Sequence, residues 1–174
     1  MFFKRQPRVL LETPRCILQL PELRDHMQWV KQRQSSKHFL MEWEPVWSPD
    51  YISKRAFQKR VYWANKSFLN QSSLPLFIIR KEDQQLLGAI TLDNIRRGPA
   101  QSGTLGYWIG HDFAQLGYMS EAIKAVVAYC FSKIDLSRIE ASTLPENIPS
   151  RGLLEKSGFK YEGVAQSYLQ ISGR

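Results

Sequence analysis

The residues with the clearest chemical potential lie in a glycine-containing loop that leads into a helix. Gly110 and Gly117 bound this loop, and apolar residues at spacings of three and four predict a helix over 117–133. The first turn of a helix has free backbone N–H groups and about half a positive charge, so it binds phosphate without a dedicated side chain. Tyr118, Met119 and Ser120 would supply these N–H groups. The pattern indicates a phosphate site, although an ordinary strand-to-helix connection can have the same composition.

Strands and helices alternate on both sides of this loop. The runs 76–80 and 86–95 are separated by a polar turn and predict a hairpin, and 104–109 predicts a third strand. Asn147 and Gly158 are suited to begin and end a short helix. The other expected elements are strands over 16–20, 138–144, 159–164 and 168–171, helices over 22–35 and 48–71, a loop over 36–48 and a basic lead-in over 1–12. This order predicts one α/β or α+β domain around a mixed sheet.

Length and composition exclude several classes of protein. The 174 residues suit a single domain, and an aromatic content of 12% argues against disorder. No uncharged apolar run approaches the roughly 20 residues that a bilayer requires, and the charged first residues argue against a secretory signal. Cys16 and Cys130 are too few for a disulfide framework or a zinc site. We therefore expect no metal, two buried thiols and a cytoplasmic location.

The net charge of +8 is distributed along the chain and is not gathered in one run. Such a charge can be a solvated basic surface. It also suits an anionic partner, either a phosphorylated cofactor or RNA. Charge alone does not separate these interpretations.

Six segments, taken in chain order, resemble the GNAT acetyltransferase family. The similarity is greatest to the RimJ/RimL branch, which acetylates the N-termini of ribosomal proteins. The segments are GYWIG at 106–110, QLGYMSEA at 115–122, RIEA at 138–141, PENIPS at 145–150, LEKSGF at 154–159 and EG at 162–163. LETPR at 11–15, WEP at 43–45, GAI at 88–90 and YLQISG at 168–173 also fit this branch.

The resemblance implies a GNAT fold: a central mixed, mostly antiparallel sheet, flanked by helices and splayed into a V-shaped cleft for acetyl-CoA. It implies acetyl transfer to an amine by direct attack in a ternary complex. The amides of 115–120 would hold the diphosphate, the strand end at 108–110 would pair with pantetheine, and Ser150 would protonate the departing thiolate. The implied cofactor-binding residues are Trp108, Ile109, Gly110, Gln115, Leu116, Gly117, Tyr118, Met119, Ser120, Asn147 and Ser150.

The acceptor side is implied by a second set of residues. Trp43 and Glu44 lie in the loop that would border the acceptor site, and Asp93 and Asn94 lie at the end of a hairpin strand. Glu44 could take a proton as the general base, or provide a counter-charge for the incoming ammonium. A histidine or a water molecule could carry the proton instead.

Two positions depart from the family's pattern. Ala114 stands where the phosphate loop usually begins with Gln or Arg. The sequence ends at Ser172-Gly173-Arg174, where relatives turn into a last strand, so we expect this final strand to be missing from the sheet. Truncation, further residues beyond this sequence and pairing with another subunit would each account for it.

The most direct prediction is an acetyl-CoA-dependent N-acetyltransferase that modifies the N-terminal α-amino group of a ribosomal protein, as a monomer or a homodimer. One alternative is an acetyltransferase for a small amine, such as an aminosugar, a polyamine or an antibiotic. Another is a degenerate GNAT-like protein that binds RNA or the ribosome without catalysis.

Overall fold

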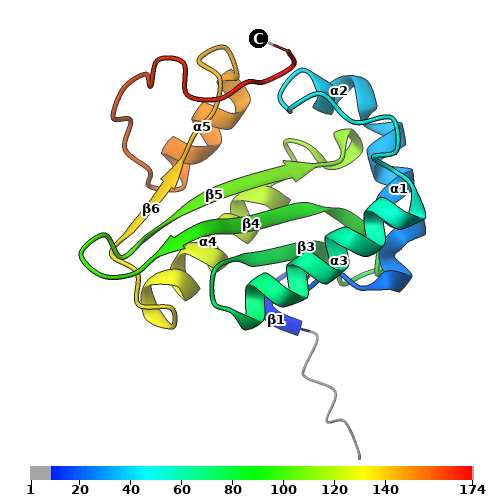
Figure 1. Cartoon of the computed structure of the whole chain (residues 1–174), viewed down its shortest axis with the longest axis horizontal. Coiled ribbons are helices and arrows are strands. Elements are labelled where there is room, and N and C mark those ends of the chain that lie inside the picture. The colour runs from blue at the N-terminus through cyan, green and yellow to red at the C-terminus, as the bar shows by residue number, and fades with distance from the viewer. Residues whose placement is uncertain (1–8, 174) are drawn as a thin grey trace, which may run out of the picture.

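The computed structural model describes residues 9–173, which form a six-stranded sheet with helices on both faces (Figure 1). The strands follow one another in space in the order of the chain. All neighbours are antiparallel except β5 and β6, which are parallel. The strands are β1 (Val9–Glu12), β2 (Cys16–Gln19), β3 (Leu74–Arg80), β4 (Leu86–Arg96), β5 (Ser102–Ile109) and β6 (Arg138–Ala141). The predicted mixed, mostly antiparallel sheet is therefore confirmed.

Helices cover the two faces of this sheet, and a separate core lies under each face. Figure 1 shows α3 in front of the sheet and α4 behind it. In β3, Leu76 and Ile78 pack in the core beneath α4, whereas Phe77 and Ile79 pack in the core beneath α1 and α3. This alternation is the two-residue period of a strand buried on both faces. The helices are η1 (Leu23–Asp25), α1 (His26–Ser35), α2 (Lys37–Met41), α3 (Lys54–Leu69), η2 (His111–Phe113), α4 (Tyr118–Ser132) and α5 (Ile148–Lys156).

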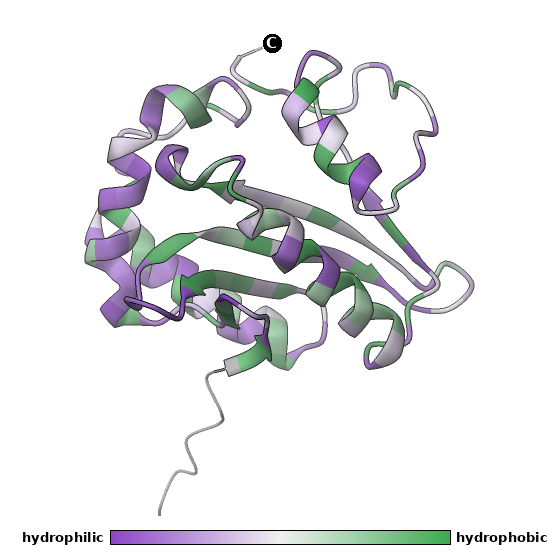
Figure 2. Ribbon diagram, turned by 180° about the vertical axis from the view of Figure 1, so that it is seen from behind, coloured by the Kyte–Doolittle hydropathy of each residue, from purple (hydrophilic) through white to green (hydrophobic). Residues whose placement is uncertain are grey.

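Hydrophobic residues gather in the central strands, as the view from the side of α4 shows (Figure 2). Burial of α4 follows most of the apolar face, since Met119, Ala122, Ile123, Val126 and Cys130 are buried. Phe131, which the apolar spacing also placed on this face, is exposed. Within residues 9–173, none of the helices combines the length and the apolar character that crossing a bilayer requires.

Several predicted element boundaries are wrong. The lead-in predicted over 1–12 ends in β1, while its first eight residues lie outside the described part of the chain. The predicted loop over 36–48 contains α2. The strands predicted over 159–164 and 168–171 are absent from the sheet among the described residues, and this segment is exposed apart from the half-buried Phe159 and Ile171. Burial and a paired neighbour are what stabilise a strand, and these runs have neither.

The start of α3 also differs from the prediction, which placed it at Ser48. The Ser48 hydroxyl donates to Asp50 Oδ1 at 2.8 Å, and the Ser48 carbonyl accepts from Tyr51. These bonds close a turn that ends before the helix. Ser53 is the actual N-cap, because its side chain accepts from the Ala56 amide at 3.1 Å.

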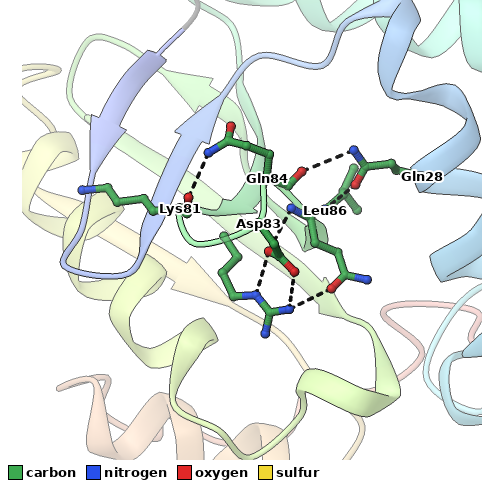
Figure 3. A network of polar contacts seen from close by, with 7 residues as sticks. Gln28, Lys81, Asp83, Gln84 and Leu86 are labelled. Atoms are coloured by element: carbon green, nitrogen blue, oxygen red, sulfur yellow. Dashed lines mark hydrogen bonds and ion pairs between the residues drawn. The ribbon is translucent and has the colours of Figure 1, made fainter.

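A polar network ties α1 to the turn between β3 and β4 (Figure 3). Asp83 accepts two hydrogen bonds from Arg80, at 2.9 and 2.7 Å. From α1, Gln28 donates to the Gln84 carbonyl at 3.3 Å and accepts from the Leu86 amide at 2.8 Å. These bonds hold α1 against the β3–β4 hairpin, and α1 contributes to the site described next.

Candidate active site

Strand β5 is paired on one side along its whole length and on the other side along only half of it. Residues 102–105 pair with 138–141 of β6, whereas 106–109 pair only with 88–91 of β4. In the described part of the chain, the β6-facing edge of 106–109 has no strand partner. Figure 1 shows β6 leading away from β5 toward α5. The opening leaves backbone groups of β5 free to pair with an extended, amide-containing chain.

This opening leads to the start of α4. Gly117 is the N-cap residue in the left-handed conformation, with φ of 85°, and Gln115 also has a positive φ of 61°. Because glycine adopts a positive φ at little cost, Gly117 allows the chain to turn sharply into the helix. The N–H groups of the first turn have no partner within the helix. An anionic group at the end of an extended ligand would fit here, and acetyl-CoA has this form.

Glycine on the neighbouring strand β4 allows the end of β5 to approach closely. A Cβ on Gly88 would overlap the Trp108 carbonyl oxygen and lie 2.8 Å from Ile109 Cα. Gly110 is buried, and its amide donates to the Leu87 carbonyl at 2.8 Å. These contacts fix the backbone at 108–110, where the sequence predicted pantetheine binding.

The N-terminus of α5 lies on the opposite side of the opening. Asn147 caps this helix as predicted, with its Oδ1 accepting from the Ser150 amide at 3.1 Å. The Ser150 hydroxyl lies 2.7 Å from the Tyr107 hydroxyl. Burial raises the pKa of Tyr107 and the hydrogen bond with Ser150 only partly opposes this, so the phenol is protonated at neutral pH. The structure thus connects the predicted acid, Ser150, to a residue of β5.

A cavity of about 600 Å³ lies on the face of the sheet covered by α1 and α3, and Tyr107 is one of its lining residues. Its walls come from α1, α3, the loop between α2 and α3, and strands β3 to β5. Tryptophan and tyrosine side chains make up much of the lining. The aromatic and charged lining residues are Trp29, Arg33, Glu44, Trp47, Tyr51, Arg60, Trp63, Phe77, Asp93, Tyr107 and Trp108.

A buried ion pair forms one wall of this cavity. Arg33 is 2% exposed, and its two terminal nitrogens donate to the Glu44 carboxylate at 2.9 and 2.6 Å. Trp47 Nε1 donates to the same carboxylate at 2.8 Å. The guanidinium also lies 4.5 Å from the centroid of the Trp108 ring and donates to the Tyr51 hydroxyl. Both oxygens of Glu44 are therefore occupied, and its predicted role as base or counter-charge stays a prediction.

Of the other residues predicted for the acceptor site, only Asp93 is among those that line the cavity. Asp93 is half-buried and lines the cavity, and no Lys or Arg of the described residues pairs with it. Asn94 is exposed at an irregularity of the β4–β5 pairing, with φ of 50°. Trp43 is half-buried but is not among the residues that line the cavity, whereas Trp47 is.

Arg33, Trp47 and Tyr107 were missed by the sequence analysis as site residues. Tyr107 lies within GYWIG and Trp47 is the last residue of WEPVW. Both segments include residues that resemble the family, and this resemblance was a signal that could have identified the two residues. Arg33 had no such signal, because a buried arginine in a helix looks like any surface arginine. Cys130 is buried as predicted, and burial raises the pKa of its thiol to about 12.

The fold, the opening beside β5 and the cavity together suit an acetyltransferase, and comparison with known families agrees. The model of the GNAT acetyltransferase domain matches residues 15–160. The chain therefore belongs to the GNAT acetyltransferase family, whose acetyl donor is acetyl-CoA. The predicted family, enzyme class and donor are confirmed.

Individual relatives point to one branch of this family. The chain is 30% identical to the ribosomal protein uS5-alanine N-acetyltransferase of Escherichia coli over 97% of its own length and 87% of the relative's. It is 28% identical to Mycobacterium smegmatis RimJ, solved with CoA-disulfide, at a TM-score of 0.85, covering 91% of this chain and 76% of that one. A ribosomal-protein-S5-alanine acetyltransferase from Vibrio fischeri is 25% identical at a TM-score of 0.86, covering 93% and 88%.

Proposed function

We propose that the protein acetylates the N-terminal α-amino group of a ribosomal protein, by direct attack of the amine on acetyl-CoA in a ternary complex. The observation that carries this proposal is the contact between Tyr107 and Ser150. Tyr107 belongs to the stretch of β5 that borders the aromatic cavity, while its side chain packs with the core beneath α4 and reaches Ser150 at the N-terminus of α5. An amine in the cavity and a thioester in the opening would therefore meet at this stretch of β5, beside the Tyr107–Ser150 pair.

The cavity suits a primary amine at the end of a chain. Asp93 provides a carboxylate with no cationic partner among the described residues, and an ammonium group can pair with it. The rings of the lining already carry the guanidinium groups of Arg33 and Arg60, so Asp93 is the group that attracts the amine. The amine must lose its proton before it attacks. Because Arg33 and Trp47 occupy Glu44, we assign to Glu44 the shaping of the cavity wall, and to water the removal of the proton.

The amine attacks the thioester carbon of bound acetyl-CoA, the carbon–sulfur bond breaks, and coenzyme A leaves as the thiolate. Ser150 donates its hydroxyl proton to the departing sulfur, and the protonated Tyr107 replaces that proton across the 2.7 Å hydrogen bond. Tyr107 then regains from water the proton that the amine has released there. The backbone of β5 at 108–110 holds the pantetheine arm. The start of α4 binds the diphosphate through the amides of 115–120.

The proposed class of acceptor rests on the relatives, one of which is named ribosomal protein uS5-alanine N-acetyltransferase. Such an acceptor would place the enzyme in the cytoplasm with the ribosomes. The net charge of +8 also favours approach to an RNA-rich particle.

The test is incubation of the full chain with acetyl-CoA and short peptides that begin with alanine or serine. CoA release is followed with a thiol reagent, and the product is located by mass spectrometry. We expect acetylation of the free α-amine and none of a peptide blocked there. Acetylation of aminosugars or polyamines alone would refute the proposal that the acceptor is a protein N-terminus. Salt-dependent RNA binding without turnover would refute the proposal that the protein catalyses acetyl transfer.

Asp93→Asn tests the ammonium contact. We expect the KM of the peptide to rise about tenfold, because a charge-assisted hydrogen bond contributes about 1.5–3 kcal/mol. Asp135→Asn is the matched control: Asp135 is exposed between α4 and β6, and its φ of 58° is tolerated by asparagine. Equal KM values in the two variants would exclude Asp93 from the acceptor site.

A further inference from the structure

Arg15, in the turn between β1 and β2, is bound to both sides of the start of α4. Its Nε donates to Glu121 Oε2 at 2.9 Å, and its backbone amide donates to Glu121 Oε1 at 2.8 Å. Its Nη1 donates to the Leu116 carbonyl at 3.1 Å, across 101 positions of sequence. One side chain thus joins the loop before the helix to the first turn of the helix.

The guanidinium also lies against the residues that turn the chain into α4. Its central carbon is 4.2 Å from the centroid of the Tyr118 ring, and a Cβ on Gly117 would lie 3.2 Å from its Nη2. In the part of the chain that the structure describes, no acceptor is bound to Nη2. The Arg15 side chain is 45% exposed, so this nitrogen remains accessible to a ligand at the loop.

An anionic ligand at the start of α4 requires that the negative charge of Glu121 be compensated by Arg15. Burial opposes the ionisation of Glu121, but hydrogen bonds from Thr13 and Arg15 outweigh it and lower its pKa. A carboxylate therefore stands in the first turn of α4 at neutral pH, where it would repel a diphosphate. The segment 114–121 contains no Lys or Arg that could compensate it.

We propose that Arg15 is a positioning residue for the diphosphate of acetyl-CoA: it neutralises Glu121 and holds the loop at Leu116 and Gly117 in the anion-binding conformation. The cation that the loop lacks is thus supplied from a turn about 100 residues earlier in the chain. This inference rests on the use of acetyl-CoA and not on the identity of the acceptor.

Calorimetric titration of the full chain with CoA tests the proposal without any acceptor. Arg15→Ala leaves the Glu121 carboxylate without a cationic partner, so we expect CoA to bind at least tenfold more weakly. Adding Glu121→Gln to this variant removes the exposed charge and should recover most of the loss. In the same titrations, the ratio of CoA affinity to pantetheine affinity should fall by the same factor, because pantetheine lacks the diphosphate.

Arg96→Ala is the matched control. Arg96 pairs with Glu140 at 3.3 Å, but it lies at the opposite end of the β4–β5 hairpin from the loop, so CoA affinity should be unchanged. Arg15→Lys is the second variant if Arg15→Ala does not fold. Lysine keeps the charge but cannot contact Glu121 and Leu116 in the same fork geometry, and we expect a loss of about threefold to tenfold.

Four results would overturn the proposal. The first is CoA affinity within twofold of wild type in both Arg15 variants, and the second is an equal loss in Arg96→Ala. The third is a failure of Glu121→Gln to recover affinity in the Arg15→Ala background, because charge neutralisation predicts that recovery. The fourth is an equal loss of affinity for CoA and for pantetheine, which would exclude a role at the diphosphate.

Discussion

Removing the carboxylate of Glu44 should destabilise the fold more than it slows the chemistry. Arg33 is 2% exposed and would keep its charge in the interior without an anion. Breaking a buried ion pair costs about 3–5 kcal/mol, and the side chain of Glu44 is 19% exposed, so we take the lower end, about 3 kcal/mol, for Glu44→Ala. For a chain of this length, that corresponds to a fall in Tm of about 6–12 °C.

The assay combines urea denaturation, thermal denaturation and steady-state kinetics. Glu44→Gln keeps an acceptor for Trp47 and should lose about half as much stability as Glu44→Ala. Replacing both Arg33 and Glu44 by methionine removes the two charges together and should recover most of the stability. The kcat of Glu44→Gln should fall less than tenfold.

The opposite pattern would refute this reasoning. A general base contributes typically about 10²–10⁴-fold to the rate. If Glu44→Gln unfolds at the wild-type urea concentration but loses 100-fold or more in kcat, then Glu44 is the base and its contact with Arg33 is secondary.

Three further changes test other parts of the site. Gly88→Ala places a Cβ against the Trp108 carbonyl, so it should cost about 1–3 kcal/mol in urea denaturation and weaken CoA binding by calorimetry; unchanged CoA affinity would contradict the placement of pantetheine along β5. Tyr107→Phe should lower kcat by about tenfold to a hundredfold without changing the Kd of CoA, whereas an unchanged kcat would mean that Ser150 acts without it. Because hydrogen bonds hold the pKa of Glu121 below its usual value of 4.5, its stabilising effect is complete above that pH and is lost as the pH falls through the lowered pKa. Urea midpoints of wild type and Glu121→Gln should therefore differ at pH 7 and converge in acid, and a constant difference would contradict this linkage.

Elements with strong local signals were predicted to within a few residues. Helix α4 has one apolar face, α5 has its Asn147 cap, and Gly158 ends α5 with the expected positive φ of 91°. The hairpin of β3 and β4 was also predicted from a local signal, because its strands are rich in β-branched and apolar residues.

Elements without such signals were not predicted. Strand β1 was assigned to the lead-in because it has only four residues, three of which pair in register, and their partner β2 must already be in place. The run 159–164 has the composition of a strand but stays outside the sheet, since composition does not say whether a neighbouring edge is present to pair with it.

The amino-acid sequence by itself determined the local features of this protein: the start of α4 after Gly117, the cap at Asn147, the position of Ser150 in the first turn of α5 and the left-handed end of that helix at Gly158. Each depends on residues only a few positions apart, so propensity and spacing are sufficient to find it. Only the tertiary structure decided which side chains meet.

Tyr107 reaches Ser150 across 43 positions, Arg33 reaches Glu44 across 11, and Arg15 reaches the first turn of α4 across 106. Periodicity reports the face on which a side chain lies, but not the partner that packing brings to that face. For that reason the sequence could indicate the loop proposed to bind the cofactor. The contact between Tyr107 and Ser150, the ion pair of Arg33 with Glu44 and the contacts of Arg15 with the start of α4 required the folded chain.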